Sequence, residues 1–157
     1  MKYIFTLGFI IATITLNAQV KVLSLKELNK RISNGKDTAY VVNLWATWCA
    51  PCVEELPNFD RLHKENLTQP IKVILLSLDF KSKLKSDLIP FAIKHQLTAE
   101  TYVIDEPNQQ TFRKVMHKDW TGVIPTTLFI NTKKKIKVLY EKPFTYPELN
   151  QALTDLK

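Results

Sequence analysis

Cysteine, histidine and glycine are all scarce in this sequence of 157 residues. It has two cysteines and three histidines, and the histidines stand far apart, so the roughly four ligands of a structural zinc site are not expected. With three glycines, 45% hydrophobic and 24% charged residues, the composition excludes a fibrous or disordered chain. The length suits one globular domain, and nothing in the sequence points to a bound cofactor.

A hydrophobic run long enough to cross a bilayer is also missing. The apolar and hydroxyl stretch at residues 3–16 follows Lys2. It is shorter than the roughly 20 apolar residues that a membrane-spanning helix needs. Ala18 comes soon after it, a layout typical of a secretory signal peptide, and no cysteine follows that could carry a lipid. We expect a cleaved signal peptide at 1–18 and a periplasmic or otherwise exported domain at 19–157 without stable membrane insertion; retention of the N-terminal segment as an anchor is the alternative.

Basic residues outnumber acidic ones, and the formal net charge is +7. Such a charge can attract nucleic acid or an anionic membrane, but it can also keep a solvated surface soluble. The lysines are scattered, and their tightest cluster, Lys133–Lys135, stands where a hairpin turn is expected and basic residues commonly protect a sheet edge. We therefore expect a solvated surface and no nucleic-acid partner.

Hydrophobic periodicity predicts alternating helices and strands. Helices are expected at 24–32, from 53 onward, at 87–96, 108–117 and 147–156. Strands are expected at 40–45, 71–78 and 101–104, followed by a hairpin of 126–131 and 136–140. Ser24 and Glu27 form a capping box at the start of the first helix. The alternation predicts an α/β fold with a central mixed β-sheet flanked by helices.

Cys49 and Cys52 stand where the strand at 40–45 gives way to a helix. Unpaired N–H groups and the helix dipole stabilise a thiolate at this position, which lowers the pKa of Cys49 below the usual value of about 8.5. Cys52 follows one turn later as the resolving thiol, and Pro51 suits the first helical turn. A purely structural disulfide would close a very short loop and stabilise little. The spacing therefore predicts a redox-active pair.

Two segments carry a family resemblance. Residues 45–57 read WATWCAPCVEELP and residues 122–127 read GVIPTT. The first resembles the active-site signature, and the second the cis-proline segment, of the TlpA/ResA-like branch of the thioredoxin superfamily. The resemblance extends over essentially the whole of 19–157, and it implies a thioredoxin-like fold with thiol:disulfide oxidoreductase activity.

The resemblance also implies a substrate-binding site beside the cysteines. Pro125 would follow a cis peptide bond and lie against the pair, a bond that proline makes far less costly than other residues do. Ile124 would then offer its backbone to an extended substrate chain. Trp48 and Pro51, which adjoin the cysteines in the sequence, are expected to contact the same substrate.

Glu55 matches a glutamate that this branch uses to adjust thiol protonation, as a partly buried carboxylate with a raised pKa can do. The alternative is an acid in the first helical turn that the helix dipole favours. Asn43 stands where thioredoxin carries a buried acid. Because an amide cannot take the proton of Cys52, the resemblance leaves that role to Glu55 or to water.

The resulting hypothesis is an extracytoplasmic protein-disulfide reductase. Its partners would be disulfide-containing proteins and a separate electron donor, such as a membrane thiol carrier. A disulfide oxidase or isomerase is the alternative, because potentials of such pairs run from about −270 to about −120 mV. A copper-handling or scaffolding module is disfavoured by the two-residue spacing of the cysteines. A peroxidase is not expected, since no further cysteine remains.

Overall fold

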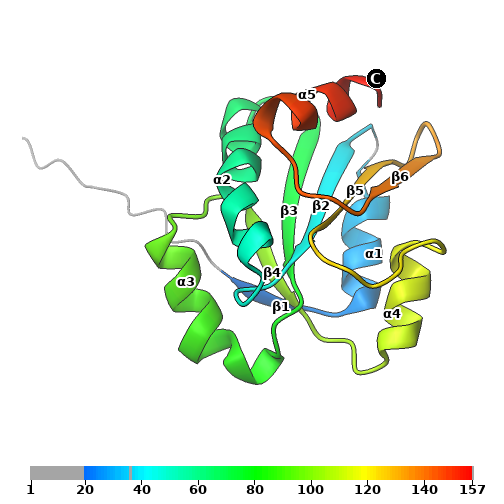
Figure 1. Ribbon diagram of the computed structural model, residues 1–157. Helices are drawn as coiled ribbons and strands as arrows, with labels where there is room; N and C mark the ends of the chain where they lie inside the picture. Colours follow the sequence, from blue (N-terminus) through cyan, green and yellow to red (C-terminus); the bar gives the residue numbers. More distant parts are fainter. Residues whose placement is uncertain (1–19, 36, 157) are drawn as a thin grey trace, which may run out of the picture.

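A six-stranded mixed β-sheet runs through the middle of the fold (Figure 1). The computed structural model describes residues 20–35 and 37–156, so the signal peptide expected at 1–18 lies outside the described residues. The strands are β1 (Lys21–Leu23), β2 (Ala39–Trp45), β3 (Ile71–Ser77), β4 (Glu100–Ile104), β5 (Thr126–Asn131) and β6 (Ile136–Tyr140). Their order across the sheet is β1-β4-β3-β2-β5-β6. Strands β1, β4, β3 and β2 run parallel to one another, whereas β5 pairs antiparallel with both β2 and β6.

Helices cover both faces of the sheet and bury a separate hydrophobic core on each (Figure 1). One face carries α1 (Leu25–Ser33) and α4 (Gln109–Met116). The other carries α2 (Ala50–Glu65), α3 (Ile89–Lys94) and α5 (Tyr146–Thr154). The predicted α/β fold with a central mixed sheet is thereby confirmed. None of the helices in the described ranges is long and apolar enough to span a membrane.

Strand β2 is buried because it pairs with β3 and β5 and has helices above and below. Its side chains alternate between the two cores, as the pleat of a strand requires. Val41 and Trp45 belong to the core under α2, and Val42 and Leu44 to the core under α1. By the same alternation, Asn43 lies on the α2 side, which places an amide beneath the helix that carries the cysteines.

Local sequence signals fix several helix ends. Ser24 caps α1 as predicted: its Oγ accepts from the backbone N–H of Glu27 (3.3 Å), and the Glu27 carboxylate accepts from the backbone N–H of Ser24 (2.8 Å). Thr145 and Glu148 form a second capping box at the start of α5. Both boxes satisfy N–H groups that have no partner within the helix.

The structure differs from the predicted elements at two places. Strand β1 was not predicted, because it is three residues long and two of them are exposed, so it has too little alternation to recognise. The helix expected at 87–96 begins instead with a 3-10 turn at Lys81–Lys83 and a π-helical turn at Leu84–Leu88, and regular α3 follows.

Candidate active site

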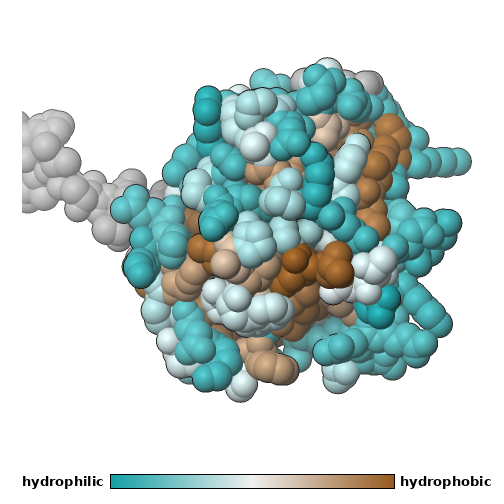
Figure 2. Space-filling view, viewed as in Figure 1, coloured by the Kyte–Doolittle hydropathy of each residue, from teal (hydrophilic) through white to brown (hydrophobic). Residues whose placement is uncertain are grey.

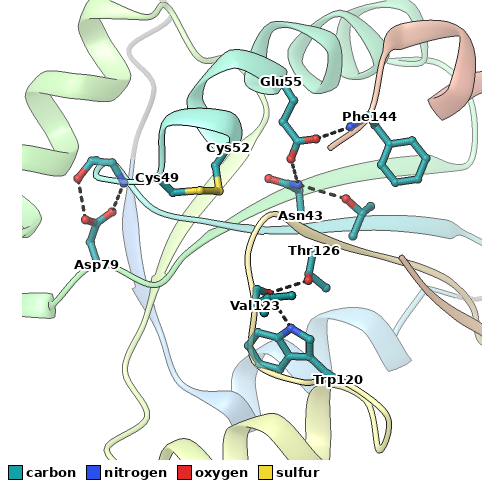
Figure 3. The surroundings of a disulfide bond; sticks show 11 residues. Asn43, Cys49, Cys52, Glu55, Asp79, Trp120, Val123, Thr126 and Phe144 are labelled. Carbon is teal, nitrogen blue, oxygen red and sulfur yellow. Dashed lines mark hydrogen bonds between the residues drawn. A yellow bond between two sulfur atoms is a disulfide. The ribbon is translucent and has the colours of Figure 1, made fainter. Parts of the chain in front are cut away.

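Cys49 and Cys52 form a disulfide at the end of β2 and the start of α2 (Figure 3). Their Cα atoms are 5.2 Å apart, and Cys49 is the N-cap residue of α2. Cys49 is 7% exposed, whereas Cys52 is fully buried. Pro51 lies in the first turn, where its missing N–H would have had no helical partner. A partner can therefore approach Cys49 more readily than Cys52, in keeping with attacking and resolving roles.

A buried carboxylate holds the loop that leads into Cys49. Asp79, just beyond the end of β3, accepts hydrogen bonds from the backbone N–H (3.0 Å) and the hydroxyl (2.7 Å) of Thr47 (Figure 3). It also accepts from the hydroxyl of Ser77 (2.7 Å). Sequence reasoning did not single out Asp79, although a polar residue directly after a buried strand, at the carboxyl edge of a parallel sheet, is a usable signal.

Glu55 lies one turn beyond Cys52 on α2 and is buried, with 3% of its surface exposed. Its Oε1 accepts from Nδ2 of Asn43 (2.8 Å), and its Oε2 accepts from the backbone N–H of Phe144 (2.7 Å) (Figure 3). Asn43 donates a second bond to the hydroxyl of Thr127 (3.2 Å). Phe144 is 89 residues away in sequence, so this contact had no local signal.

Burial raises the pKa of Glu55 to about 7, although the hydrogen bonds from Phe144 and Asn43 act in the opposite direction. A carboxyl group with this pKa can both hold and release a proton near neutral pH. Since residues three apart face the same side of a helix, Glu55 and Cys52 are neighbours on α2. The structure thus brings together the three residues predicted to be catalytic, Cys49, Cys52 and Glu55.

The loop before β5 provides the other side of the site. The Ile124–Pro125 peptide bond is cis, as the resemblance implies. Because Thr126 pairs with Leu44 near the end of β2, Pro125 lies close to the start of the cysteine loop. The carbonyl of Val123 accepts from Trp120 Nε1 (2.9 Å) and from the Thr126 hydroxyl (2.8 Å), which fixes the loop (Figure 3).

Apolar side chains are exposed around the disulfide. Trp48 is 70% exposed, Phe80 77% and Val123 52%. Trp48 and Phe80 follow Thr47 and Asp79, whose hydrogen bonds hold the two loops together. Figure 2 shows pale, tan and brown atoms gathered on this face over the start of α2 and the loop before β5. Sequence reasoning named Trp48 but missed Phe80, because a lone phenylalanine after a strand resembles a core residue.

Metal ligands do not gather near the disulfide. Within 20–35 and 37–156, no three histidine, cysteine, aspartate or glutamate side chains are grouped so as to hold a metal ion. The structure places the buried carboxyl groups of Glu55 and Asp79 and the buried amide of Asn43 around the two cysteines.

A thioredoxin-like fold with a Cys-x-x-Cys disulfide at a helix N-terminus defines a thiol:disulfide oxidoreductase. The chain belongs to the AhpC/TSA family, whose sequence profile matches residues 11–139. It is 26% identical over 127 residues to the thiol-disulfide oxidoreductase ResA of Geobacillus thermodenitrificans, covering 81% of this chain and 68% of that protein. The predicted TlpA/ResA-like relationship is thereby confirmed.

Solved structures share the fold. A thioredoxin-related protein from Neisseria meningitidis serogroup B superimposes with a TM-score of 0.67 at 22% identity, covering 78% of this chain and 87% of that one. A secreted thiol-disulfide isomerase from Corynebacterium glutamicum gives a TM-score of 0.62 at 21% identity, covering 79% of this chain and 73% of that one.

Proposed function

We propose that this oxidoreductase works as a reductase of disulfides in partner proteins outside the cytoplasm. The observation that carries the proposal is the unequal pair: Cys49 at the helix N-terminus reaches the surface, and Cys52 lies buried beside the Glu55 carboxyl group. The similarity to the ResA protein supports the same activity class. A partner's disulfide can reach the Cys49 thiol, and the buried Cys52 thiol is then placed to release the reduced partner.

The reaction begins with the reduced protein. The Cys49 thiolate attacks one sulfur of the partner's disulfide, which breaks that bond and forms a mixed disulfide. Cys52 then loses its proton to Glu55 and attacks the Cys49 sulfur, so the partner leaves with two thiols and the Cys49–Cys52 disulfide forms. Two electrons pass from the cysteine pair to the partner, and protons from Glu55 and solvent complete the partner's thiols. The pKa of about 7 suits Glu55 to this exchange at neutral pH.

The substrate is a polypeptide held across the disulfide. Trp48, Pro51 and Pro125 border the cysteines, and the Ile124 backbone pairs with an extended segment of the partner. Exposed Phe80 adds apolar surface on the β3 side. An apolar rim of this kind suits a protein chain better than a small thiol such as glutathione.

Export is the second part of the proposal. Residues 1–18 act as a cleaved signal peptide, and 19–157 form the exported thioredoxin-like domain. The basic, apolar and small-residue order of the leader supports this, as does the structural similarity to a secreted protein. In an oxidising compartment the reductase needs a separate electron donor, such as a membrane thiol carrier. Mass spectrometry of protein from the native host tests the cleavage, since retention of residues 1–18 would contradict it.

The direction of exchange is tested by the reduction potential. A reductase should have a value toward about −270 mV, whereas a value near about −120 mV would identify an oxidant and overturn the reductive assignment. The partner is tested by the Cys52→Ser variant, which should accumulate mixed disulfides in cells, with Cys49→Ser as the matched control that forms none. The similarity to a secreted isomerase makes isomerisation the second candidate; it predicts refolding of a scrambled disulfide protein by catalytic amounts of enzyme.

A further inference from the structure

The amide of Asn43 carries one of the two buried side-chain atoms in the described residues that lack a hydrogen-bond partner; the other is Nε1 of Trp45. Asn43 is fully buried in β2, where it pairs with Leu75 of β3 and Thr127 of β5. Both hydrogens of its Nδ2 are used, one by Glu55 Oε1 (2.8 Å) and one by Thr127 Oγ1 (3.2 Å). Its Oδ1 has no hydrogen-bond partner among the described residues. A buried carbonyl oxygen without a donor is rare and calls for an explanation.

The direction of this oxygen follows from the two bonds of the nitrogen. An amide is planar, so fixing both N–H groups also fixes the side to which Oδ1 points. A turned amide would place Oδ1 against the acceptor oxygen of the Glu55 carboxylate, so the hydrogen-bond network selects the observed orientation. In Figure 3 the Asn43 amide lies below the Glu55 carboxylate, and its oxygen is on the side of the Cys49–Cys52 disulfide.

We propose that Asn43 is a positioning residue for the reduced state, in which its Oδ1 accepts a hydrogen bond from the Cys52 thiol. The inference rests on the proposed function, because it concerns the same exchange reaction. In the disulfide, Cys52 has no hydrogen to donate. Reduction with two electrons and two protons breaks the S–S bond, and Cys52 gains a hydrogen in a place closed to solvent.

The proposed bond gives Asn43 a positioning role that involves no proton transfer to its side chain. The amide exchanges no proton itself; it holds the Cys52 thiol on one side and the Glu55 carboxyl group on the other. The reduced state gains a hydrogen bond that the oxidised state lacks, so Asn43 favours reduction of the pair. It also keeps the resolving thiol oriented for attack on the mixed disulfide.

Infrared spectroscopy of the Cys52 thiol tests the bond directly. In the Cys49→Ser variant Cys52 is the only thiol of the chain, so the S–H stretching band has a single source. A hydrogen-bonded thiol absorbs at lower frequency than a free one. We expect the lowered band in Cys49→Ser and a return to the free frequency when Asn43→Ala is added. A free-thiol band in Cys49→Ser, or a lowered band that persists without Asn43, would overturn the inference; the latter would assign the bond to another acceptor, such as the Glu55 carboxyl group.

A matched substitution separates this effect from loss of packing. Asn131 is another buried asparagine, on β5 at the opposite end of β2, where it pairs with Ala39. Asn131→Ala in the Cys49→Ser background should destabilise the fold but leave the S–H band unchanged. Movement of the band in this control would assign the effect to general loosening and contradict the inference.

The redox equilibrium supplies a second measurement that does not need the Cys49→Ser background. Asn43→Ala should shift the equilibrium with glutathione toward the disulfide by about threefold to tenfold, or about 14–30 mV at 29.6 mV for each factor of ten. An unchanged or less negative potential would contradict the proposed bond. A lowered S–H band without reductase activity would refute only the proposed function, whereas reductase activity with a free-thiol band would refute only this inference.

Discussion

The buried carboxyl group of Glu55 makes the stability of the protein depend on pH in a way that one substitution removes. The group ionises near 4.5 when exposed and near 7 in the fold, because burial disfavours its charged form. Between these values the folded state holds a proton that the unfolded chain has released. The free energy of unfolding therefore falls as the pH rises through this window, and it levels off above about pH 7.

The size of the effect follows from the two pKa values. At about 1.36 kcal/mol for each pKa unit, the interval from 4.5 to about 7 corresponds to about 3 kcal/mol. Glu55→Gln removes the titration. It also leaves either Asn43 or the Phe144 N–H without its acceptor, which costs about 1–3 kcal/mol at every pH. The informative quantity is the change with pH of the difference between the two proteins, since the constant cost cancels.

Urea denaturation of the oxidised protein between about pH 4 and pH 8 measures this difference. The wild type should exceed Glu55→Gln most at low pH, and the gap should close by about 3 kcal/mol, or reverse, toward pH 8. Other titrating groups are common to both proteins and cancel. Glu54→Gln is the matched control, because Glu54 is the exposed neighbour in the same helical turn and its loss should leave the pH dependence intact. A gap between wild type and Glu55→Gln that stays constant across the range would refute the reasoning.

Three further substitutions test the surroundings of the disulfide. Phe80→Ala should raise KM for a protein disulfide severalfold while leaving reduction of a small disulfide and the Tm unchanged, because the side chain is exposed. Asp79→Ala leaves the N–H and hydroxyl of Thr47 without an acceptor, so it should lower the free energy of unfolding, measured in urea, by about 2–3 kcal/mol. The control is Asp105→Ala, which removes an exposed ion pair and should cost less than about 1 kcal/mol. Gly122→Ala forces a side chain into φ +96° and should cost about 1–2 kcal/mol, read as a lower Tm; an unchanged Tm would contradict it.

Much of the fold was predictable because it depends on local patterns. The apolar runs of β2 and β3 are buried on both faces, and the hairpin of β5 and β6 has the predicted bounds, since its strands and lysine-rich turn are adjacent in sequence. The Ser24 capping box marked the start of α1 for the same reason. Strand β1 could not be predicted because it is defined by its pairing with β4, which is distant in sequence, and its three residues have no recognisable strand pattern.

The candidate site likewise has some features that local sequence predicts and others that depend on distant contacts. The cysteines and the cis-proline segment have sequence signatures, so their positions could be predicted. The partners that hold them could not be predicted: Asp79 reaches Thr47 from the loop after β3, and Glu55 accepts a hydrogen bond from the Phe144 backbone, which is distant in sequence. These contacts exist only once β2, β3 and the chain before α5 are assembled. The sequence showed that an amide, Asn43, stands where thioredoxin has an acid, but it did not show that the Oδ1 of this amide lacks a hydrogen-bond partner.

The position of β2 has a consequence for how the protein responds to each catalytic cycle. The disulfide is attached to the end of a strand that has hydrogen-bonded neighbours on both edges and packed helices on both faces. Breaking and forming the S–S bond there changes the loop at the end of β2 and leaves the pairing and packing of the strand itself unchanged. The amide hydrogens of β2 should therefore be among the slowest to exchange with solvent in both redox states, so that repeated turnover places no demand on refolding.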